Sequence, residues 1–222
     1  MAGIEKRAAP GETDGYAELY ALQDQVLDAV FSVESEFYLT GGTCLSRFYQ
    51  AKRYSDDLDF FANDSPRYAF ALRTIRTALA DTLAMSVEVE TKNFQRLIVN
   101  AKLQVDFVND GPFHYKEPVV TEKKYLIDNI ENILANKLTA VIGRDNPKDI
   151  FDTVLIYTYY PFSWSDVLNA AHQKAGFTNE DLAVRLKSFP RSMLDQIKCI
   201  DCSFLENFDA AVSEIIRAVL AE

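Results

Sequence analysis

Two aspartates, Asp57 and Asp59, lie two residues apart in the segment "DDLDFF" and are suited to hold a divalent cation. Leu58 and Phe60 alternate with acids, which predicts a strand whose two carboxylates project from one face. Asp106 alternates with apolar residues in the same way in "KLQVDFV". If the two strands are neighbours, three carboxylates converge, and such a set usually holds two Mg²⁺ ions roughly 3.5–4 Å apart in phosphoryl transfer.

Two consecutive glycines, Gly41 and Gly42, come shortly before these aspartates and are followed by Thr43. Glycine lets backbone N–H groups approach a ligand without obstruction by a Cβ atom. A helix that begins directly after the glycines adds free N–H groups and the positive end of its dipole. We therefore expect Gly41, Gly42 and Thr43 to hold phosphates. Gly-Gly before a helix is most often only a tight turn, so the prediction rests on its combination with the acidic strand.

A second polar group occurs in "ANKLTAVIGRDNPKDIFDTVLI", residues 135–156. Lys137 and Arg144 are seven residues apart, which is two turns along one helical face, so both cations can meet a triphosphate. Asp149 and Asp152, three apart on the next helix, can orient Lys137 or engage a base or ribose. The alternative is a purely structural salt bridge between Lys137 and Asp152.

The elements that must position these residues follow from the apolar periodicity. Strands are predicted at 36–40, 56–61, 86–90, 94–100 and 102–108, and helices at 16–31, 43–51, 65–83, 122–143, 147–159, 164–175, 179–188, 190–199 and 204–221. The predicted fold class is α+β. A mixed β-sheet with helices forms residues 1–120, and a C-terminal helical bundle forms residues 121–222.

The net charge of the 222-residue chain is −10, which does not favour nucleic-acid binding through the overall field. Local basic patches around Lys52 and Arg53, or Lys123 and Lys124, stay possible, and the acidity also suits a basic protein partner. No apolar run approaches the roughly 18 residues of a membrane span. Residues 1–15 read as a polar leader without a secretory signal. The chain is therefore expected in the cytoplasm, away from membranes.

The three cysteines are few and odd in number, which favours a reducing compartment over a disulfide framework. Cys199 and Cys202 form a single C-x-x-C without a second ligand pair. We expect them to be half-buried helical thiols rather than a zinc or redox site.

The order Gly-Gly, spacer, D-x-D in "GGTCLSRFYQAKRYSDDLDFF" resembles the nucleotidyltransferase superfamily of DNA polymerase beta. More narrowly, it is similar to the AbiEii/AbiGii-type nucleotidyltransferase toxins. The second block, residues 135–156, is similar to that family's Lys-Leu-x-Ala, Arg, Lys-Asp-x-x-Asp segment. The blocks lie about 80 residues apart, as the family's do, and the resemblance spans most of residues 35–160. The region after residue 160 carries no matching motif.

The resemblance implies a role for each matching residue. Gly42 and Thr43 would contact the triphosphate, and Asp57 and Asp59 would bind the metal. Asp106 would be the third carboxylate or the base, a match that rests on strand position only. In the second block, Lys137 matches the family's lysine and Asp152 its closing aspartate, and the flanking nucleotide-binding candidates are Arg144, Lys148 and Asp149. It further implies a Mg²⁺-dependent enzyme that transfers NMP from an NTP to an RNA, such as a tRNA end, or to a protein. Such an enzyme is expected to be the toxin of a bacterial toxin–antitoxin or phage-defence system, with a cognate antitoxin protein as partner.

Two other functions stay open at this point. One is a small-molecule nucleotidyltransferase of the antibiotic-modifying kind on the same fold, and the other is a non-catalytic nucleotide-binding module. The sequence leaves the nucleotide, the acceptor and the oligomeric state undecided.

Overall fold

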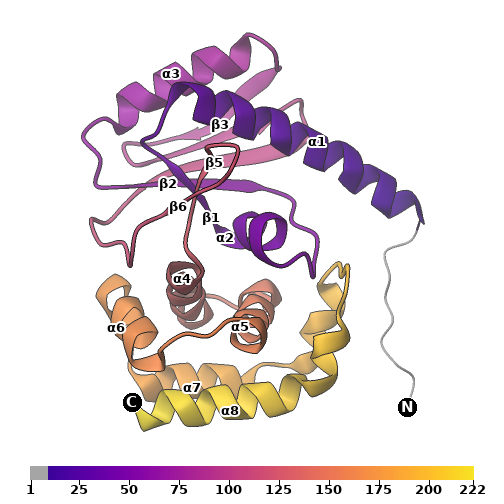
Figure 1. Ribbon diagram of the computed structural model, residues 1–222, viewed down its shortest axis with the longest axis vertical. Coiled ribbons are helices and arrows are strands. Elements are labelled where there is room, and N and C mark those ends of the chain that lie inside the picture. Colours follow the sequence, from indigo (N-terminus) through magenta and orange to yellow (C-terminus); the bar gives the residue numbers. More distant parts are fainter. Residues whose placement is uncertain (1–9) are drawn as a thin grey trace.

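The computed structural model describes the backbone of residues 10–222 and the side chains of residues 15–222. Residues 1–9 of the expected polar leader lie outside the described part. From Pro10 onward the leader expectation is wrong, because helix α1 (Pro10–Val33) already begins there. Figure 1 shows the sheet with α1 and α3 in the upper half of the molecule and α4 to α8 in the lower half, with α2 between them.

The N-terminal half contains the strands and the first helices. After α1 come β1 (Tyr38–Thr40), α2 (Gly41–Cys44), the π-helix η1 (Leu45–Tyr49), β2 (Leu58–Asn63), α3 (Tyr68–Ala80), β3 (Met85–Glu90), β4 (Phe94–Val99), β5 (Leu103–Asp110), β6 (Val119–Val120) and β7 (Leu126–Ile127). The strands form one seven-stranded mixed sheet in the order β3-β4-β5-β2-β1-β7-β6. β2 runs parallel to β5 and β1 parallel to β7, and the other neighbours are antiparallel.

The register between β2 and β5 decides where their acids point. Phe60 is paired with Phe107, and the two rings stack with centroids 5.1 Å apart in the core. Because side chains alternate along a strand, burial of this phenylalanine pair directs Asp59 and Asp106 to the opposite face. Asp59 and Asp106 are Cα partners in the same register. The parity argument from the sequence therefore agrees with the observed sheet.

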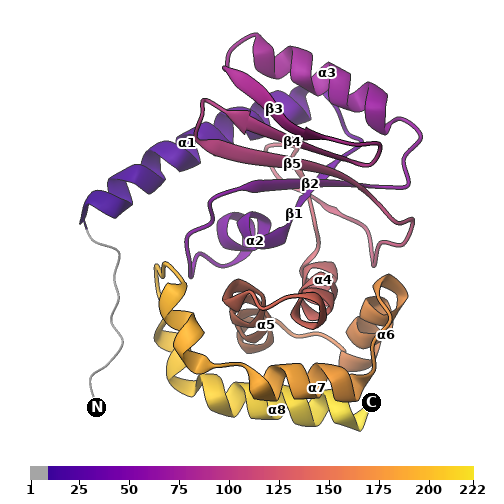
Figure 2. The same ribbon diagram turned by 180° about the vertical axis from the view of Figure 1, so that it is seen from behind.

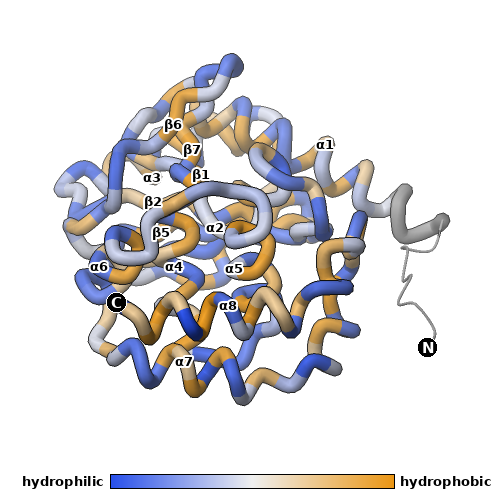
Figure 3. Tube along the Cα trace, turned by 60° about the horizontal axis from the view of Figure 1, so that its bottom comes forward, coloured by the Kyte–Doolittle hydropathy of each residue, from blue (hydrophilic) through white to orange (hydrophobic). Residues whose placement is uncertain are grey.

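The C-terminal half is helical. It contains α4 (Ile130–Gly143), α5 (Pro147–Tyr159), α6 (Trp164–Lys174), α7 (Asn179–Ser188), the 3₁₀ helices η2 (Arg191–Gln196) and η3 (Ser203–Asn207), and α8 (Phe208–Ala221). Figures 1 and 2 show α7 and α8 side by side below α4 and α5. In Figure 3, hydrophobic and hydrophilic positions alternate along α7 and α8, as expected for helices that bury one face. Among the described residues, no helix is long and apolar enough to cross a membrane.

Three local expectations are wrong. The helix expected at 122–143 begins at Ile130, because Ile127 pairs with Leu39 and Asn129 caps the helix by accepting a hydrogen bond from the Asn132 N–H. The sheet thus extends past residue 120. The helix expected at 190–199 is the 3₁₀ helix η2, and the one expected at 204–221 divides into η3 and α8.

The C-x-x-C segment also differs from the expectation. Cys199 and Cys202 form a disulfide and are not helical thiols, whereas Cys44 is a buried free thiol. Their segment is extended, because Cys199 forms an antiparallel bridge with Arg53 and the Lys198 carbonyl accepts from the Tyr54 N–H at 2.9 Å. This backbone pairing links the C-terminal half to the loop that precedes β2.

Candidate active site

A cavity of about 500 Å³ lies between the sheet and the helical half. It is lined by Thr40, Gly41, Gly42, Asp59, Phe61, Asp110, Ile133, Asn136, Lys137, Thr139, Ala140, Gly143, Arg144, Asp149 and Lys174. Both sequence blocks contribute to this lining, although they are far apart in the chain. The cavity is large enough for a ligand of nucleotide size.

The acidic wall of the cavity is formed by β2. Asp59 projects from β2, and Asp57 comes directly before the strand. Burial raises the pKa of Asp59 to about 7, with Asp57 and Asp106 acting in the same direction and Lys137 and Arg144 against it. Asp59 forms no ion pair within the described part of the chain. Without a paired cation, the Asp59 carboxyl therefore holds its proton up to about pH 7, and a cation bound beside it would favour the charged form.

Gly41 lies directly against Asp59. Its φ is +72°, in the left-handed region that favours glycine, and a Cβ atom there would lie 2.6 Å from Asp59 Oδ2. Thr40, the residue before it, is the antiparallel partner of Asp59. The first glycine is thus required both for the turn and for the approach of the carboxylate.

Gly42 lines the cavity and also lies against buried side chains, whereas Thr43 lies in the interior. A Cβ atom on Gly42 would lie 2.2 Å from Arg53 Nη2. The Thr43 side chain is fully buried, and its hydroxyl lies 2.7 Å from the Ser55 hydroxyl and 2.5 Å from the Asp57 carbonyl oxygen. The structure therefore uses the Thr43 hydroxyl to hold the loop that leads into Asp57.

Asp106 is on the expected face but has a partner of its own. Arg96, its neighbour on β4, donates two hydrogen bonds to the Asp106 carboxylate at 2.8 and 2.7 Å. Gln104 donates a further bond at 3.2 Å. Asp106 therefore lies beside Asp59 in the β2–β5 register, with Arg96 balancing its charge. Across the described residues, no group of three or more His, Cys, Asp or Glu residues is arranged to hold a metal ion.

Opposite the acids lies a buried network of charges from α4, α5 and the loop before β2. Lys137 Nζ contacts Asp149 Oδ1 at 3.0 Å and Asp152 Oδ2 at 2.7 Å. Arg53 donates to both Asp152 oxygens at 2.7 Å, and Arg144 donates to Asp149 at 2.7 and 3.1 Å. Three cations thus share two carboxylates, so the network carries excess positive charge, and Lys137, Arg144 and Asp59 line the same cavity.

The network stabilises the charged forms of its members. Burial by itself would raise the pKa of Asp152, but Arg53 and Lys137 hold it below its ordinary value. Burial would also lower the pKa of Lys137, but Asp152 and Asp149 outweigh this effect and raise it. Lys137 therefore stays an ammonium in the interior, with its ion pairs to α5 fixing its position.

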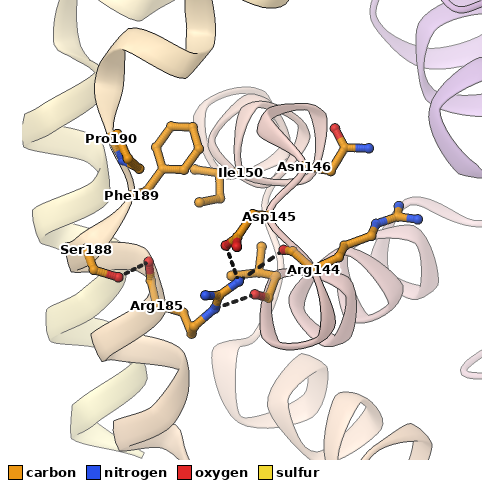
Figure 4. A pocket seen from close by; sticks show the side chains of 9 residues that line it. Arg144, Asp145, Asn146, Ile150, Arg185, Ser188, Phe189 and Pro190 are labelled. Atoms are coloured by element: carbon orange, nitrogen blue, oxygen red, sulfur yellow. Dashed lines mark hydrogen bonds and ion pairs between the residues drawn. The ribbon is translucent and has the colours of Figure 1, made fainter.

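Arg144 reaches the network from a different position than the sequence predicts. It is not on a helical face with Lys137, because α4 ends at Gly143 and Arg144 follows with extended backbone. Arg185 of α7 donates to the carbonyl oxygens of Val141 (3.0 Å) and Arg144 (3.1 Å), which places a cation at the C-terminal end of α4. Figure 4 shows this arrangement beside a hollow of about 30 Å³, with the Arg144 side chain directed away from Arg185. That hollow is too small for a nucleotide.

Lys148 lies apart from these residues. Its ammonium contacts the carboxylate of Asp56 at 3.1 Å, and both side chains are exposed. Lys148 does not line the cavity. Of the candidates from the second block, Lys137, Arg144 and Asp149 border the cavity, and Asp152 supports them from behind.

Sequence reasoning misses several supporting residues. The sequence places Arg53 only in a candidate basic patch, yet its side chain is buried and holds Asp152. Asp128, also fully buried, accepts hydrogen bonds from Thr40 (2.6 Å) and Asn132 (2.9 Å), and so ties the glycine turn to α4. The sequence signal for both residues is weak, because an arginine in a polar segment and a lone aspartate before a helix are common in proteins of every class.

The residues present fit a divalent cation in part. Asp57 and Asp59 offer hard oxygen donors that form no ion pair with a described residue, and Mg²⁺ commonly binds through one or two carboxylates together with substrate phosphates. Gly41 leaves space beside the Asp59 carboxylate. The hydrogen bonds from Arg96 do not prevent Asp106 from serving as a third ligand, because a carboxylate has about four lone-pair sites and metal-ligating carboxylates are commonly hydrogen-bonded.

Comparisons with known proteins identify a family and a fold. The model of one protein family, described as nucleotidyl transferase AbiEii toxin, type IV toxin–antitoxin system, matches residues 25–219. Among solved structures, JHP933 from Helicobacter pylori is 19% identical with a TM-score of 0.58, covering 93% of this chain and 91% of that one. MenT4, a nucleotidyltransferase toxin from Mycobacterium tuberculosis H37Rv, is 13% identical with a TM-score of 0.60, covering 93% and 84%. At these identities the likeness shows a shared fold. No curated protein matches the chain.

Proposed function

This chain belongs to the AbiEii nucleotidyltransferase toxin family, and on that premise we propose that it transfers NMP from an NTP to a hydroxyl group of an RNA, such as a tRNA end, or of a protein. It is a nucleotidyltransferase of the type IV toxin–antitoxin class. One observation carries the proposal for its site. The carboxyl group of Asp59, which forms no ion pair, faces Lys137 and Arg144 across one cavity of nucleotide size, and Asp57 lies directly before β2.

In the proposed complex the triphosphate lies between these two walls. The glycine turn at Gly41 and Gly42 contributes backbone N–H groups, and Lys137 and Arg144 contribute positive charge. Asp57 and Asp59 would hold Mg²⁺, which when bound supplies charge neutralisation at the reacting phosphate. For a second ion, Asp106 is the candidate third carboxylate, held in place by its hydrogen bonds from Arg96.

The reaction is an in-line displacement at the α-phosphorus. The acceptor hydroxyl forms the new P–O bond, the bond to the β-phosphate oxygen breaks, and pyrophosphate leaves. The hydroxyl proton passes to a base, for which Asp106 is the candidate. Lys137, fixed by Asp149 and Asp152, offsets the charge that develops on the leaving group.

The test uses four α-labelled NTPs, Mg²⁺ and total bacterial RNA. We expect the labelled NMP of one or more of the NTPs to become attached to RNA or to protein. Asp59→Asn should lower the rate by about a hundredfold or more, and the matched control Asp195→Asn, at an exposed position of η2, should not. A folded Asp59→Asn variant that transfers label at the wild-type rate would reject the proposed role of this carboxylate.

We also propose that the chain acts in the cytoplasm with a cognate antitoxin protein as partner, as the family description suggests. Expression of the chain alone should arrest bacterial growth, and co-expression of the adjacent gene should restore it. Growth arrest that persists when the Asp59→Asn variant is expressed would separate toxicity from nucleotide transfer.

A further inference from the structure

Lys174 is a cavity residue that neither sequence block contains. It is the last residue of α6, in the region that carries no recognised motif, and its side chain is half-buried where it lines the cavity. Its contacts are weak. The ammonium lies 3.5 Å from the Phe113 carbonyl oxygen and 5.5 Å from the centroid of the Phe113 ring.

The other two cavity cations differ from Lys174 in their partners. Lys137 and Arg144 both contact the Asp149 carboxylate, at 3.0 and 2.7 Å. Within residues 15–222, Lys174 forms no ion pair. Its nearest negative charges, Asp128 and Asp110, act on it only through space. Lys174 is therefore the cavity cation whose hydrogen-bond donors are largely uncommitted.

This state is costly for a half-buried cation. Burial lowers the pKa of Lys174 below its ordinary value, and Asp128 and Asp110 offset only part of that effect. A partly desolvated ammonium without a counter-ion is stabilised when an anion enters beside it. The geometry thus leaves a place for a negatively charged ligand at this end of the cavity.

The position of Lys174 indicates which anion this is. Asp128, which acts on Lys174, accepts a hydrogen bond from Thr40 at 2.6 Å, and Thr40 directly precedes the glycine turn. Lys174 and the glycine turn line the same cavity, and the turn offers backbone N–H groups that suit phosphate oxygens. A compact ammonium with three donors binds phosphate as a point charge.

We infer that Lys174 binds a phosphate oxygen of the nucleotide's triphosphate, so that α6 of the helical half forms part of the NTP site. The inference rests on the proposed function. It adds a residue from outside both motifs and makes NTP binding depend on the position of α6 against the sheet.

The test is a binding titration without acceptor. Each of the four NTPs, and inorganic tripolyphosphate, is titrated with Mg²⁺ into the wild type and into Lys174→Met, which keeps the aliphatic stem and removes the charge. We expect Lys174→Met to weaken binding of every ligand that the wild type binds by about ten- to a hundredfold, as for loss of one charge-assisted hydrogen bond. Lys174→Arg should retain affinity within a few fold, and the control Lys187→Met, at an exposed position of α7, should bind as the wild type does.

The outcomes separate the inference from its premise. If the wild type binds none of the five ligands, the proposed function fails and the inference fails with it. If the wild type binds them and Lys174→Met binds equally well, the inference alone is overturned. An equal loss in Lys174→Met and Lys187→Met would also overturn it, because a general charge effect would then account for the result. Melting temperatures close to that of the wild type show that the variants are folded, since the Lys174 ammonium has no ion pair to lose.

Discussion

We predict that Gly42 does not tolerate a methyl group, because the added Cβ atom would meet the side chain of Arg53, 11 residues further along the chain. Its φ is not in the left-handed region, since Gly41 is the glycine with positive φ among the described residues. Substitution by alanine in a helical segment should then stabilise the protein by about 0.5–1 kcal/mol. However, the added Cβ would lie 2.2 Å from Arg53 Nη2, and Nη2 donates to Asp152 at 2.7 Å. We predict that Gly42→Ala destabilises the fold.

The magnitude follows from the hydrogen bond that must be lost. Arg53 is held by two bonds to Asp152 and one to the Tyr54 carbonyl, so the guanidinium cannot move away without breaking at least one of them. A hydrogen bond to a charged group contributes about 1.5–3 kcal/mol. After the helical gain is subtracted, Gly42→Ala should lower the free energy of unfolding by about 1–2 kcal/mol. For a chain of this length the melting temperature should fall by roughly 2–8 °C.

A double-mutant cycle with Arg53→Met isolates this cause. Arg53→Met alone removes one partner of a buried pair and should cost about 3–5 kcal/mol. In the Arg53→Met background the clash is absent, so Gly42→Ala should be neutral or stabilising. Gly15→Ala is the control, because a Cβ on Gly15 of α1 meets nothing within 4 Å. Equal destabilisation by Gly42→Ala in both backgrounds, measured by urea unfolding, would refute the reasoning.

Three other predictions concern the walls of the cavity. The folded-state pKa of Asp59 is raised to about 7, so the folded protein keeps a proton that the unfolded chain loses, and the free energy of unfolding falls as pH rises from about 4 to about 7. Without metal, Asp59→Asn should therefore raise the melting temperature more at pH 8 than at pH 4. Equal shifts of the melting temperature at the two pH values would contradict this. Lys137→Ala should lower the free energy of unfolding by about 3 kcal/mol or more and slow single-turnover transfer, whereas an unchanged rate would assign Lys137 to structure alone. Arg185→Ala should remove the hydrogen bonds that Arg185 donates to the last carbonyl oxygens of α4, and should weaken NTP binding because Arg144 is then less well positioned. Lys187→Ala is the control. Unchanged NTP affinity of Arg185→Ala would show that these bonds do not position Arg144.

Much of the fold follows from local periodicity. The predicted bounds 147–159 and 179–188 are those of α5 and α7, because Pro147 and the Thr178 cap mark helix starts that need no tertiary contact. The face of Asp59 was likewise predictable, since alternation with Phe60 is a property of the strand itself. The helix expected at 43–51 differs from the structure, because Gly41 and Gly42 are themselves the first residues of the four-residue helix α2, and the π-helix η1 follows it.

Short or paired segments were not predictable in this way. β6 and β7 have two residues each, too few to show any period, and they exist because Ile127 meets Leu39 in the sheet. The segment of Cys199 is extended rather than helical because it pairs with Arg53. In each case the partner lies far away in the chain, so no window along the sequence contains the cause.

The sequence by itself determined which chemical groups this protein has and, in a regular strand such as β2, which face each one occupies, because these follow from side-chain type and alternation. Only the tertiary structure decided which groups meet. Arg53 and Asp152 are 99 residues apart and form a buried ion pair, while Asp106 pairs with Arg96 rather than opening toward Asp57. Charge–charge energies depend on distance and on the exclusion of water, and both are set by how the helical half packs against the sheet.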